Sequence, residues 1–468
     1  MKIIVWFTQD LRLNDQPALS AALKDGSEVY CTYIFDPANP EGPQGAARWW
    51  LHHSLASLQD GLAGLGLRLR ILRGDSAEAI DRLLVETKAA AVFWNCRYEP
   101  WAIAQDKAIK AALEGRGVRA RSFNAALGRE PWEVARDGGQ PYKVFTPFWR
   151  AGAAMLALPP VREAPASLPK VDNGPHGLSV DALGLTPKPE WDAGFWQRFV
   201  PGEAGAREAL DAFIDGAAAQ YLDERDRPDH AGTSRLSPHL HHGEIAPWRI
   251  AHALRDARPG GDTAVEGYVR QLGWREFAYH LLHHFPQTPE QNLNPRFADF
   301  AWARVHPGLR DAWRHGRTGV PIVDAGMREL WTTGWMHNRV RMIVGSYLCK
   351  HLRYHWREGA RWFWDTLVDA DLANNTLGWQ WIGGTGADAA PYFRIFNPVT
   401  QSEKFDPEAR FIRLYVPELA DVPGRFVHAP WTAGPPAHLG AYPRPIVEHA
   451  EARARALAMF GAIRGGAA

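Results

Sequence analysis

Residues 369–381 read Asp-Ala-Asp-Leu-Ala-Asn-Asn-Thr-Leu-Gly-Trp-Gln-Trp, and they set the expectations for the second half of the chain. Two carboxylates, an asparagine pair and two indoles stand together here, which packing alone does not explain. No His or Cys lies at ligand spacing beside Asp369 and Asp371, so we expect no metal. The 21 tryptophans of the chain can fill a large core, and such an excess also fits stacking on a ring ligand or an electron path.

The preceding segment, 337–361, is basic although the chain as a whole is not. It holds six Lys or Arg and one Glu, whereas the whole chain carries a formal net charge of +1. A solvated helical face is the ordinary explanation, but interleaved Trp and Tyr residues favour a nucleic-acid backbone as partner. The basic residues are Arg339, Arg341, Lys350, Arg353, Arg357 and Arg361.

Two further segments concentrate polar groups. The turn Gly-Thr-Ser-Arg-Leu-Ser at 232–237 offers N–H groups and hydroxyls that suit a phosphate, or it forms an ordinary capped loop. A helix is expected over 264–284, and three of its residues share one face, namely Gln271, Trp274 and Arg275. They could stack on and hydrogen-bond a ligand, or bury a Trp beside an Arg–Glu pair.

Residues 1 to about 125 alternate strand and helix signals. Short apolar or β-rich runs occur at 3–7, 29–35, 69–72, 91–94 and 120–123. Helical stretches lie between them at 16–24, 46–61, 77–88 and 101–114, with N-caps expected at Asn14-Asp15 and Asp75-Ser76. This rhythm predicts a doubly wound parallel sheet in an α/β domain. No GxGxxG follows the first strand, so we expect no NAD.

The rest of the chain reads as a connection followed by an all-α domain. Seven prolines between 159 and 190 predict an irregular linker. Helices are then expected over 203–219, 247–256, 264–284, 308–315, 324–334, 338–351, 360–368 and 446–461. We therefore expect an α/β domain over 1–130, a linker over 131–200 and a helical domain over 201–468.

Composition excludes several classes of protein. With 46% hydrophobic and 22% charged residues, the chain is neither disordered nor a coiled coil. We find no apolar run long enough for a membrane span and no signal peptide. Three cysteines (Cys31, Cys96 and Cys349) provide neither a disulfide framework nor a four-cysteine cluster. We expect a monomer in the reducing cytoplasm.

Ordered motifs along nearly the whole chain resemble those of the photolyase–cryptochrome family. They begin with Val-Trp-Phe at 5–7 and Asp-Leu-Arg-Leu-Asn-Asp at 10–15. They continue at 233–238, 274–277, 318–325, 333–339, 369–375, 397–399 and 442–447. The chain is identified as a member of this family, whose fold joins an α/β domain by a long linker to a helical domain that buries FAD.

The resemblance implies an FAD site in the helical domain. The hydroxyls of the 233–237 turn would hold the phosphates, Asp369 would face the flavin with Arg341 as its partner, and Asn375 would lie beside flavin N5. The cofactor-binding residues so implied are Tyr221, Thr233, Ser234, Leu236, Ser237, Gln271, Arg275, Asn338, Arg341, Asp369, Asp371 and Asn375.

The resemblance also implies light-driven repair of cyclobutane pyrimidine dimers in UV-damaged DNA, by an electron from reduced FAD to a flipped-out lesion. The catalytic pocket would be formed by Gln271, Trp274, Asn338, Met342, Asn375 and Trp381. DNA would be bound by Arg225, Trp274, Arg339 and Trp381. Trp379, Trp356 and Trp302 would relay electrons between flavin and surface.

Departures from the family pattern narrow the subclass. Gln271 stands where many dimer photolyases carry a Glu; an amide still donates to a thymine carbonyl but carries no charge. The branch that repairs (6-4) photoproducts has histidines at the positions of Asn338 and Met342, so dimers are the expected substrate. The alternatives are (6-4) repair and a cryptochrome-type blue-light receptor, although the signalling members' long tail does not follow Ala468.

The antenna chromophore is the remaining expectation. The run Arg-Trp-Trp-Leu-His-His-Ser-Leu at 48–55 resembles class III photolyases and plant cryptochromes, with class I still open. Methenyltetrahydrofolate is expected first, with Trp49 or Trp50 at its site, and a deazaflavin second. The Asn-Glu pair of folate-binding class I enzymes is Trp101-Ala102 here.

Overall fold

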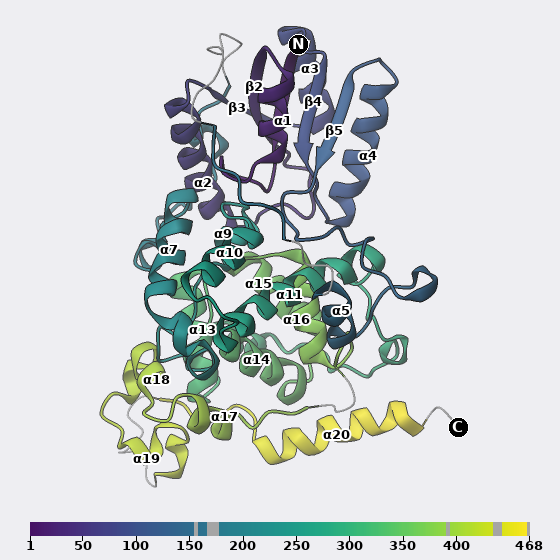
Figure 1. The fold of residues 1–468 in the computed structure, drawn as a ribbon. Coiled ribbons are helices and arrows are strands. Elements are labelled where there is room, and N and C mark those ends of the chain that lie inside the picture. The colour runs from purple at the N-terminus through teal and green to yellow at the C-terminus, as the bar shows by residue number, and fades with distance from the viewer. Residues whose placement is uncertain (154–157, 166–176, 390–393, 434–441, 466–468) are drawn as a thin grey trace.

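A computed structural model describes residues 1–153, 158–165, 177–389, 394–433 and 442–465. A sheet with flanking helices forms the N-terminal part, and a larger body of helices lies below it in Figure 1. Among the residues described, no helix is both long and apolar enough to cross a membrane.

The sheet has five parallel strands in the order β3-β2-β1-β4-β5. They are β1 (Lys2–Phe7), β2 (Glu28–Phe35), β3 (Leu69–Arg73), β4 (Ala91–Asn95) and β5 (Arg119–Phe123). After Lys2, β1 is apolar because it is buried on both faces: Ile3, Val5 and Phe7 join one core, whereas Ile4 and Trp6 join another. The predicted doubly wound sheet is confirmed.

Four helices cover the two faces of this sheet. They are α1 (Pro17–Asp25), α2 (Gly45–Gly64), α3 (Ser76–Thr87) and α4 (Pro100–Glu114). Leucines of α2 pack with Leu19 of α1 on one face, and Ile80 of α3 packs with Ile109 of α4 on the other.

Of the two expected N-caps, one is confirmed and one is wrong. Asp75 accepts a hydrogen bond from the backbone N–H of Glu78 at 3.0 Å and caps α3. The α1 cap position is Gln16, which makes no side-chain cap bond. Asp15 is occupied elsewhere, since its carboxylate accepts from Arg249 Nε at 2.6 Å and from the Arg162 N–H at 2.7 Å.

The proline-rich connection folds back onto the sheet domain where it is described. Leu178 forms an antiparallel bridge with Ile71, and Leu183 and Leu185 enter the core on the α2 side of the sheet. The connection also carries α5 (Phe145–Ala153) and α6 (Ala193–Trp196). Pro169 and Pro175 lie outside the described residues.

The described part of the helical body contains fourteen α-helices. They are α7 (Glu203–Asp215), α8 (Tyr221–Glu224), α9 (Ser237–His241), α10 (Pro247–Ala257), α11 (Thr263–His284), α12 (Pro307–Arg314), α13 (Pro321–Thr333), α14 (Asn338–Ser346), α15 (Trp356–Thr366), α16 (Leu372–Gly383), α17 (Pro398–Phe405), α18 (Arg410–Tyr415), α19 (Gly424–Val427) and α20 (His449–Gly465). The helix expected over 338–351 changes to a π-helical turn at Tyr347–His351.

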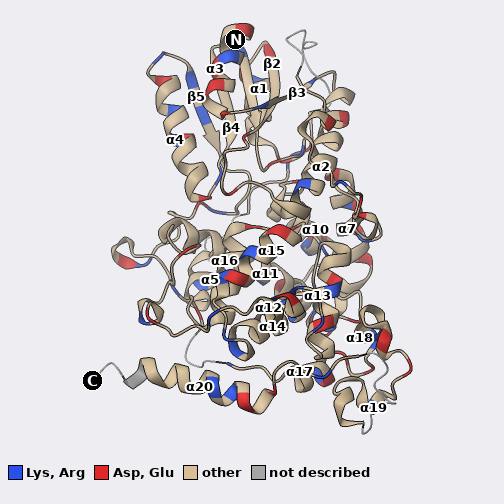
Figure 2. Ribbon diagram, turned by 180° about the vertical axis from the view of Figure 1, so that it is seen from behind, with Lys and Arg blue, Asp and Glu red and all other residues tan. Residues whose placement is uncertain are grey.

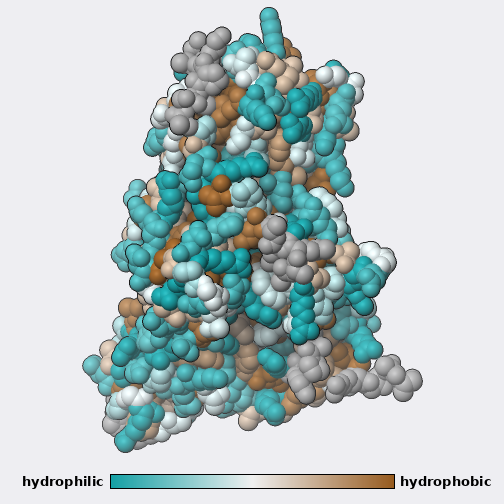
Figure 3. Space-filling view, in the orientation of Figure 1, coloured by the Kyte–Doolittle hydropathy of each residue, from teal (hydrophilic) through white to brown (hydrophobic). Residues whose placement is uncertain are grey.

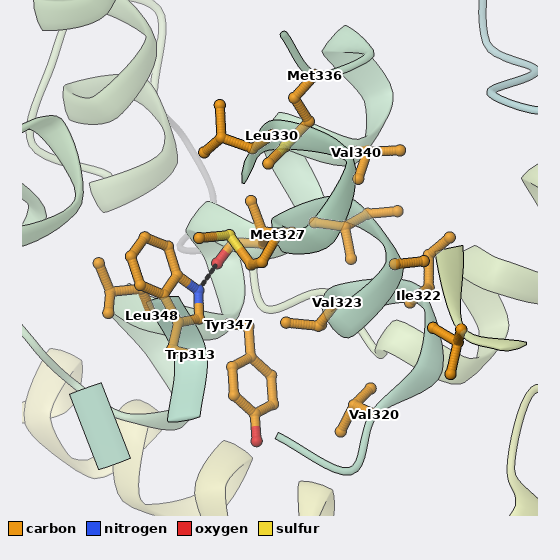
Figure 4. Packing of buried hydrophobic residues seen from close by; sticks show 14 of the residues in the cluster. Trp313, Val320, Ile322, Val323, Met327, Leu330, Met336, Val340, Tyr347 and Leu348 are labelled. Atoms are coloured by element: carbon orange, nitrogen blue, oxygen red, sulfur yellow. Dashed lines mark hydrogen bonds between the residues drawn. The ribbon is translucent and has the colours of Figure 1, made fainter. Parts of the chain in front are cut away.

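The largest core joins α13, α14 and α16. Figure 4 shows Met327 and Val323 of α13 facing Trp313, Tyr347 and Leu348, with the Trp313 indole N–H donating to the Val344 carbonyl at 3.0 Å. Trp379 of α16 belongs to the same core. Because these side chains are almost fully buried, the core fixes where α14 and α16 lie relative to each other.

The two parts of the molecule are joined through a buried carboxylate. Glu244 Oε1 accepts from the Trp50 indole N–H of α2 and from the Gly202 N–H, both at 2.8 Å. Its Oε2 lies 2.5 Å from His239 Nδ1. The sheet domain is therefore docked on the helical body by hydrogen bonds as well as by packing.

Candidate functional site

α16 carries the polar residues of 369–381 and borders open space. Its N-cap is Asp371, and Trp379 is 2% exposed. Gly378, one residue earlier, is exposed, and a Cβ built on it would meet no atom within 4 Å. α16 packs against α11, α14 and α15, yet it keeps one open position near its middle, at Gly378, three residues after Asn375.

Asp371 is the centre of a buried network. Its Oδ1 accepts from the N–H and from the Nδ2 of Asn374, each at 2.8 Å. Its Oδ2 accepts from the Tyr279 hydroxyl and lies 3.6 Å from His241 Nδ1. Burial opposes ionisation, but the neighbouring His241 ring, the positive charge of Arg275 and the Tyr279 hydroxyl outweigh it, so the pKa of Asp371 is below its ordinary value.

Asp369 and Arg341 form the expected pair. Arg341 Nη2 lies 2.8 and 3.1 Å from the two carboxylate oxygens, and Arg341 Nε donates to the Met336 carbonyl at 2.7 Å. The Asp369 side chain is 3% exposed. A carboxylate has about four acceptor positions, so Asp369 can accept a further N–H from a ring ligand.

A hydrogen bond fixes the orientation of the Asn375 side-chain amide. Its Nδ2 donates to the Ala360 carbonyl of α15 at 3.0 Å. Since a carbonyl only accepts, the nitrogen must face Ala360 and the oxygen must face away from it. Asn375 therefore offers an acceptor on the side of α16 that does not contact this carbonyl.

The 233–237 turn has its hydroxyls tied to aromatic residues. Ser234 Oγ lies 2.8 Å from the Tyr268 hydroxyl, and the Trp335 indole N–H donates to Ser237 Oγ at 3.2 Å. Tyr221 packs edge-on against Tyr268, and burial raises the pKa of Tyr221. Ser234 and Tyr221 thus both contact Tyr268, whereas Ser237 is bound by Trp335.

A small cavity of about 50 Å³ lies at the end of α16. Its lining includes Met342 of α14 and Trp381 of α16, together with Arg394. Two of the expected pocket residues therefore meet, although they are far apart in sequence. Asn338 is four residues before Met342, on the same face of α14.

Trp274 does not belong to the lining of that cavity, as far as the described residues show. Its ring stacks on Phe145 of α5, with centroids 3.7 Å apart and planes at 12°. One face of this indole is therefore covered by the protein, and only the other face could stack on a base.

The two arginines expected to bind DNA flank one carboxylate. Arg339 Nη2 donates to Asp226 Oδ2 at 2.7 Å, and Arg225 Nε lies 3.9 Å from Asp226 Oδ1. The Arg339 guanidinium also lies 4.3 Å from the Phe405 ring centre. Asp226 thus keeps both cations at one site.

The basic segment 337–361 is not the single charged surface that its composition suggested. Lys350 is 1% exposed and donates to the Gly383 carbonyl at 2.7 Å. Arg357 pairs with Glu290, and Arg341 with Asp369. Figure 2 shows Lys and Arg interspersed with Asp and Glu over the helical body. Counting charges in sequence could not reveal these partners because most of them come from other segments.

The three tryptophans of the expected relay differ in burial. Trp379 and Trp356 are 2% and 1% exposed, and Trp302 is half-buried. The His355 ring lies between the last two, 5.3 Å from Trp356 and 5.1 Å from Trp302. Burial, with the charge of Arg357, lowers the pKa of His355 to about 4, so this ring is neutral at pH 7.

Several residues of the site were missed by the sequence analysis. Tyr279 is four residues after Arg275 on α11, so the helical spacing could have indicated it. No such signal existed for four other residues, which are His241, Asp226, Phe145 and His355. The first three contact residues from distant segments, and His355 contacts the adjacent Trp356 as well as the distant Trp302. Among the described residues, no group of three or more His, Cys, Asp or Glu is placed to hold a metal ion.

Comparison with known proteins identifies the class. The family model described as the FAD binding domain of DNA photolyase matches residues 268–462, and the model described as DNA photolyase matches residues 3–169. The fold and these matches define an FAD-binding protein with an α/β N-terminal domain.

Individual relatives agree with this class. A deoxyribodipyrimidine photo-lyase of Agrobacterium fabrum is 46% identical, covering 99% of this chain and 98% of the relative. Cryptochrome-1 of Arabidopsis thaliana is 38% identical over 97% of this chain and 69% of that protein. A crystal structure of a class III photolyase from Agrobacterium tumefaciens superposes with a TM-score of 0.95 at 45% identity, covering 99% and 98% of the two chains. The chain belongs to the photolyase/cryptochrome family.

Proposed function

We propose that this chain is a deoxyribodipyrimidine photo-lyase, which repairs cyclobutane pyrimidine dimers in DNA with light. The observation that carries the proposal is the meeting of Met342 and Trp381, from two helices, at one cavity beside the polar helix α16. Its similarity over the whole chain to a photo-lyase supports the same activity.

The residues around α16 fit FAD. The open position at Gly378 leaves space against the helix, and Asp369, Asp371 and Asn375 provide acceptors for ring and ribityl N–H and O–H groups. When bound and reduced, FAD supplies the light-driven electron that splits the cyclobutane ring. The residues that we propose to hold it are Tyr221, Thr233, Ser234, Leu236, Ser237, Gln271, Arg275, Asn338, Arg341, Asp369, Asp371 and Asn375.

Lesion binding requires that the dimer leave the base stack. We assign stacking on the flipped bases to Trp381 and to the uncovered face of Trp274. We assign Asn338 and Met342 to the lesion pocket, and we assign to Gln271 the donation of an N–H to a base carbonyl. Arg225 and Arg339 bind backbone phosphates, supported by their joint position at Asp226.

Trp379, Trp356 and Trp302 form the electron path to the flavin in this proposal. The His355 ring between Trp356 and Trp302 supports Trp302 as the member nearest the surface.

An antenna, the oligomeric state and the compartment complete the proposal. Methenyltetrahydrofolate is our first candidate antenna and a deazaflavin the second. Trp49 and Trp50 are 0% exposed and donate to Asp192 and Glu244, so neither offers a free ring face.

On the face in Figure 3, hydrophobic residues form small patches among hydrophilic ones, which supports a monomer. A count of only three cysteines, at 31, 96 and 349, supports a reducing cytoplasm.

The decisive experiment is repair of a thymine-dimer oligonucleotide by the FAD-bound, reduced protein under blue light, with a dark control. Light-dependent recovery of thymine absorbance is expected. A parallel oligonucleotide carrying a (6-4) photoproduct should remain unrepaired. Repair of the (6-4) lesion alone would change the substrate, and no repair of either lesion by protein with bound FAD would point to blue-light signalling.

A further inference from the structure

Gln271 lies between a group that only donates and a group that only accepts. Arg225 Nη2 donates to Gln271 Oε1 at 3.3 Å, and Gln271 Nε2 donates to the Gly267 carbonyl at 3.3 Å. A guanidinium has no acceptor and a backbone carbonyl has no donor. The two neighbours together fix which end of the amide is oxygen and which is nitrogen.

This orientation determines what Gln271 can offer to a base. Its nitrogen carries two hydrogens, of which the Gly267 carbonyl takes one. The second hydrogen can be donated to a carbonyl oxygen of a pyrimidine. If the amide were reversed, a carbonyl oxygen would face another carbonyl at Gly267 and the donor would face a cation.

Arg225 reaches from this amide to the rim of the site. Its side chain is 25% exposed, and its guanidinium lies 5.3 Å from the Tyr221 ring centre. The Arg225–Gln271 contact joins a cation to a neutral amide, so it leaves the positive charge of Arg225 uncompensated by Gln271. A carboxylate at position 271 would instead pair with that charge.

We propose that Arg225 is a positioning residue for lesion recognition. By holding the Gln271 oxygen, Arg225 directs the amide N–H toward the base, while the same guanidinium binds a backbone phosphate. One side chain thereby couples binding of the DNA backbone to recognition of the lesion. This inference rests on the proposed repair function.

The test is a double-mutant cycle on DNA binding in the dark, with FAD-bound protein and two duplexes that differ by one thymine dimer. Gln271→Ala is expected to weaken binding of the damaged duplex about tenfold more than that of the undamaged one, because one hydrogen bond is lost. Arg225→Ala is expected to weaken both duplexes, and the damaged one by about a further tenfold. The double variant should bind the damaged duplex no more weakly than Arg225→Ala does.

Two more variants separate positioning from a general loss of charge or structure. Arg225→Lys keeps a donor and a positive charge and should restore most of the preference for the damaged duplex. Arg339→Ala is the matched control, because Arg339 pairs with Asp226. It should weaken both duplexes by the same factor and its effect should add to that of Gln271→Ala. Additive effects of Arg225→Ala and Gln271→Ala on the damaged duplex would overturn the proposal.

Repair by the wild-type protein under blue light is measured in parallel. Repair together with additive effects would overturn the positioning role and leave the repair function standing. A wild-type protein that neither repairs the dimer nor prefers the damaged duplex would overturn both.

Discussion

Trp379 occupies a space shaped for an indole. A Cβ on Gly359 would lie 2.0 Å from Trp379 Cη2, so any larger residue at 359 would displace the ring. Phe363 packs edge-on against Trp379 with ring centres 4.9 Å apart. The glycine is therefore required by the indole rather than by the backbone, and a smaller aromatic ring at 379 fits without forcing its neighbours apart.

Trp379→Phe should slow photoreduction of oxidised FAD to a small fraction of the wild-type rate, because phenylalanine is far harder to oxidise than tryptophan. Repair by chemically reduced protein should be largely retained. Flavin absorbance under blue light measures the first, and dimer repair measures the second. Trp313→Phe is the control, since Trp313 is equally buried and lies 6.3 Å from Trp379. Equal slowing in both variants would contradict the relay assignment.

Lys350 makes a pH-dependent contribution to stability. Burial lowers the pKa of Lys350 from 10.5 to about 7. The unfolded chain then binds this proton more tightly than the folded protein between about pH 7 and 10.5, so the free energy of unfolding should rise with pH across that range. The full effect is up to about 5 kcal/mol.

Lys350→Met should remove this rise. Thermal unfolding of the FAD-bound protein at pH 7 and pH 9 measures it, with Lys24→Met as the control because Lys24 is exposed on α1. The wild-type protein and the Lys24 variant should gain stability at the higher pH relative to Lys350→Met. The same gain in all three proteins would show that the Lys350 amine is not the group that titrates.

Among the elements, the strands were predicted from sequence and α16 was not. β1 and β2 are mostly apolar runs with both faces buried, so the sequence pattern identifies them as strands without knowledge of the partner strands. α16 contains an Asn pair, a glycine and two tryptophans, none of which favours a helix. Two causes stabilise it: Asp371 caps it locally, and Trp379 is buried in the core, which depends on the tertiary fold.

Gly378→Leu tests whether the open side of α16 holds the cofactor. Leucine favours a helix by about 0.5–1 kcal/mol over glycine, and a Cβ at this position meets open space, so the helix should persist. FAD bound per protein, measured by absorbance after purification, should fall strongly because the side chain fills the space. Gly461→Leu on α20 is the matched control, since a Cβ there also meets open space. Full FAD retention by Gly378→Leu would move the cofactor away from this face.

On the scale of the whole molecule, the sequence identified motifs but not their partners. The structure contains the expected Arg341–Asp369 pair. The sequence could predict this pair because both residues belong to recognisable motifs. The segment 337–361 was expected to be a basic surface, yet its cations pair with residues such as Glu290 and Asp226, whose proximity depends on the tertiary fold. Likewise, Phe145 covers Trp274 from a helix within the connection, and no local pattern indicates that contact.

Glu244 links the two parts of the molecule, so its loss should affect both. Glu244→Ala would leave the Trp50 indole N–H, the Gly202 N–H and His239 buried without their acceptor. Removing one partner from such a buried charged network costs about 3–5 kcal/mol. Thermal unfolding should shift to lower temperature, and hydrogen exchange should increase in both α2 and α9.

Glu208→Ala is the control for this change, because Glu208 lies exposed on α7, the helix that begins directly after Gly202. It should alter neither the unfolding temperature nor the exchange rates appreciably, since an exposed carboxylate contributes little to stability. If Glu244→Ala raised exchange in α9 alone, the carboxylate would serve the helical body without holding the sheet domain. Increased exchange in both elements would show that the FAD-binding body and the sheet domain depend on one buried acceptor for their mutual position.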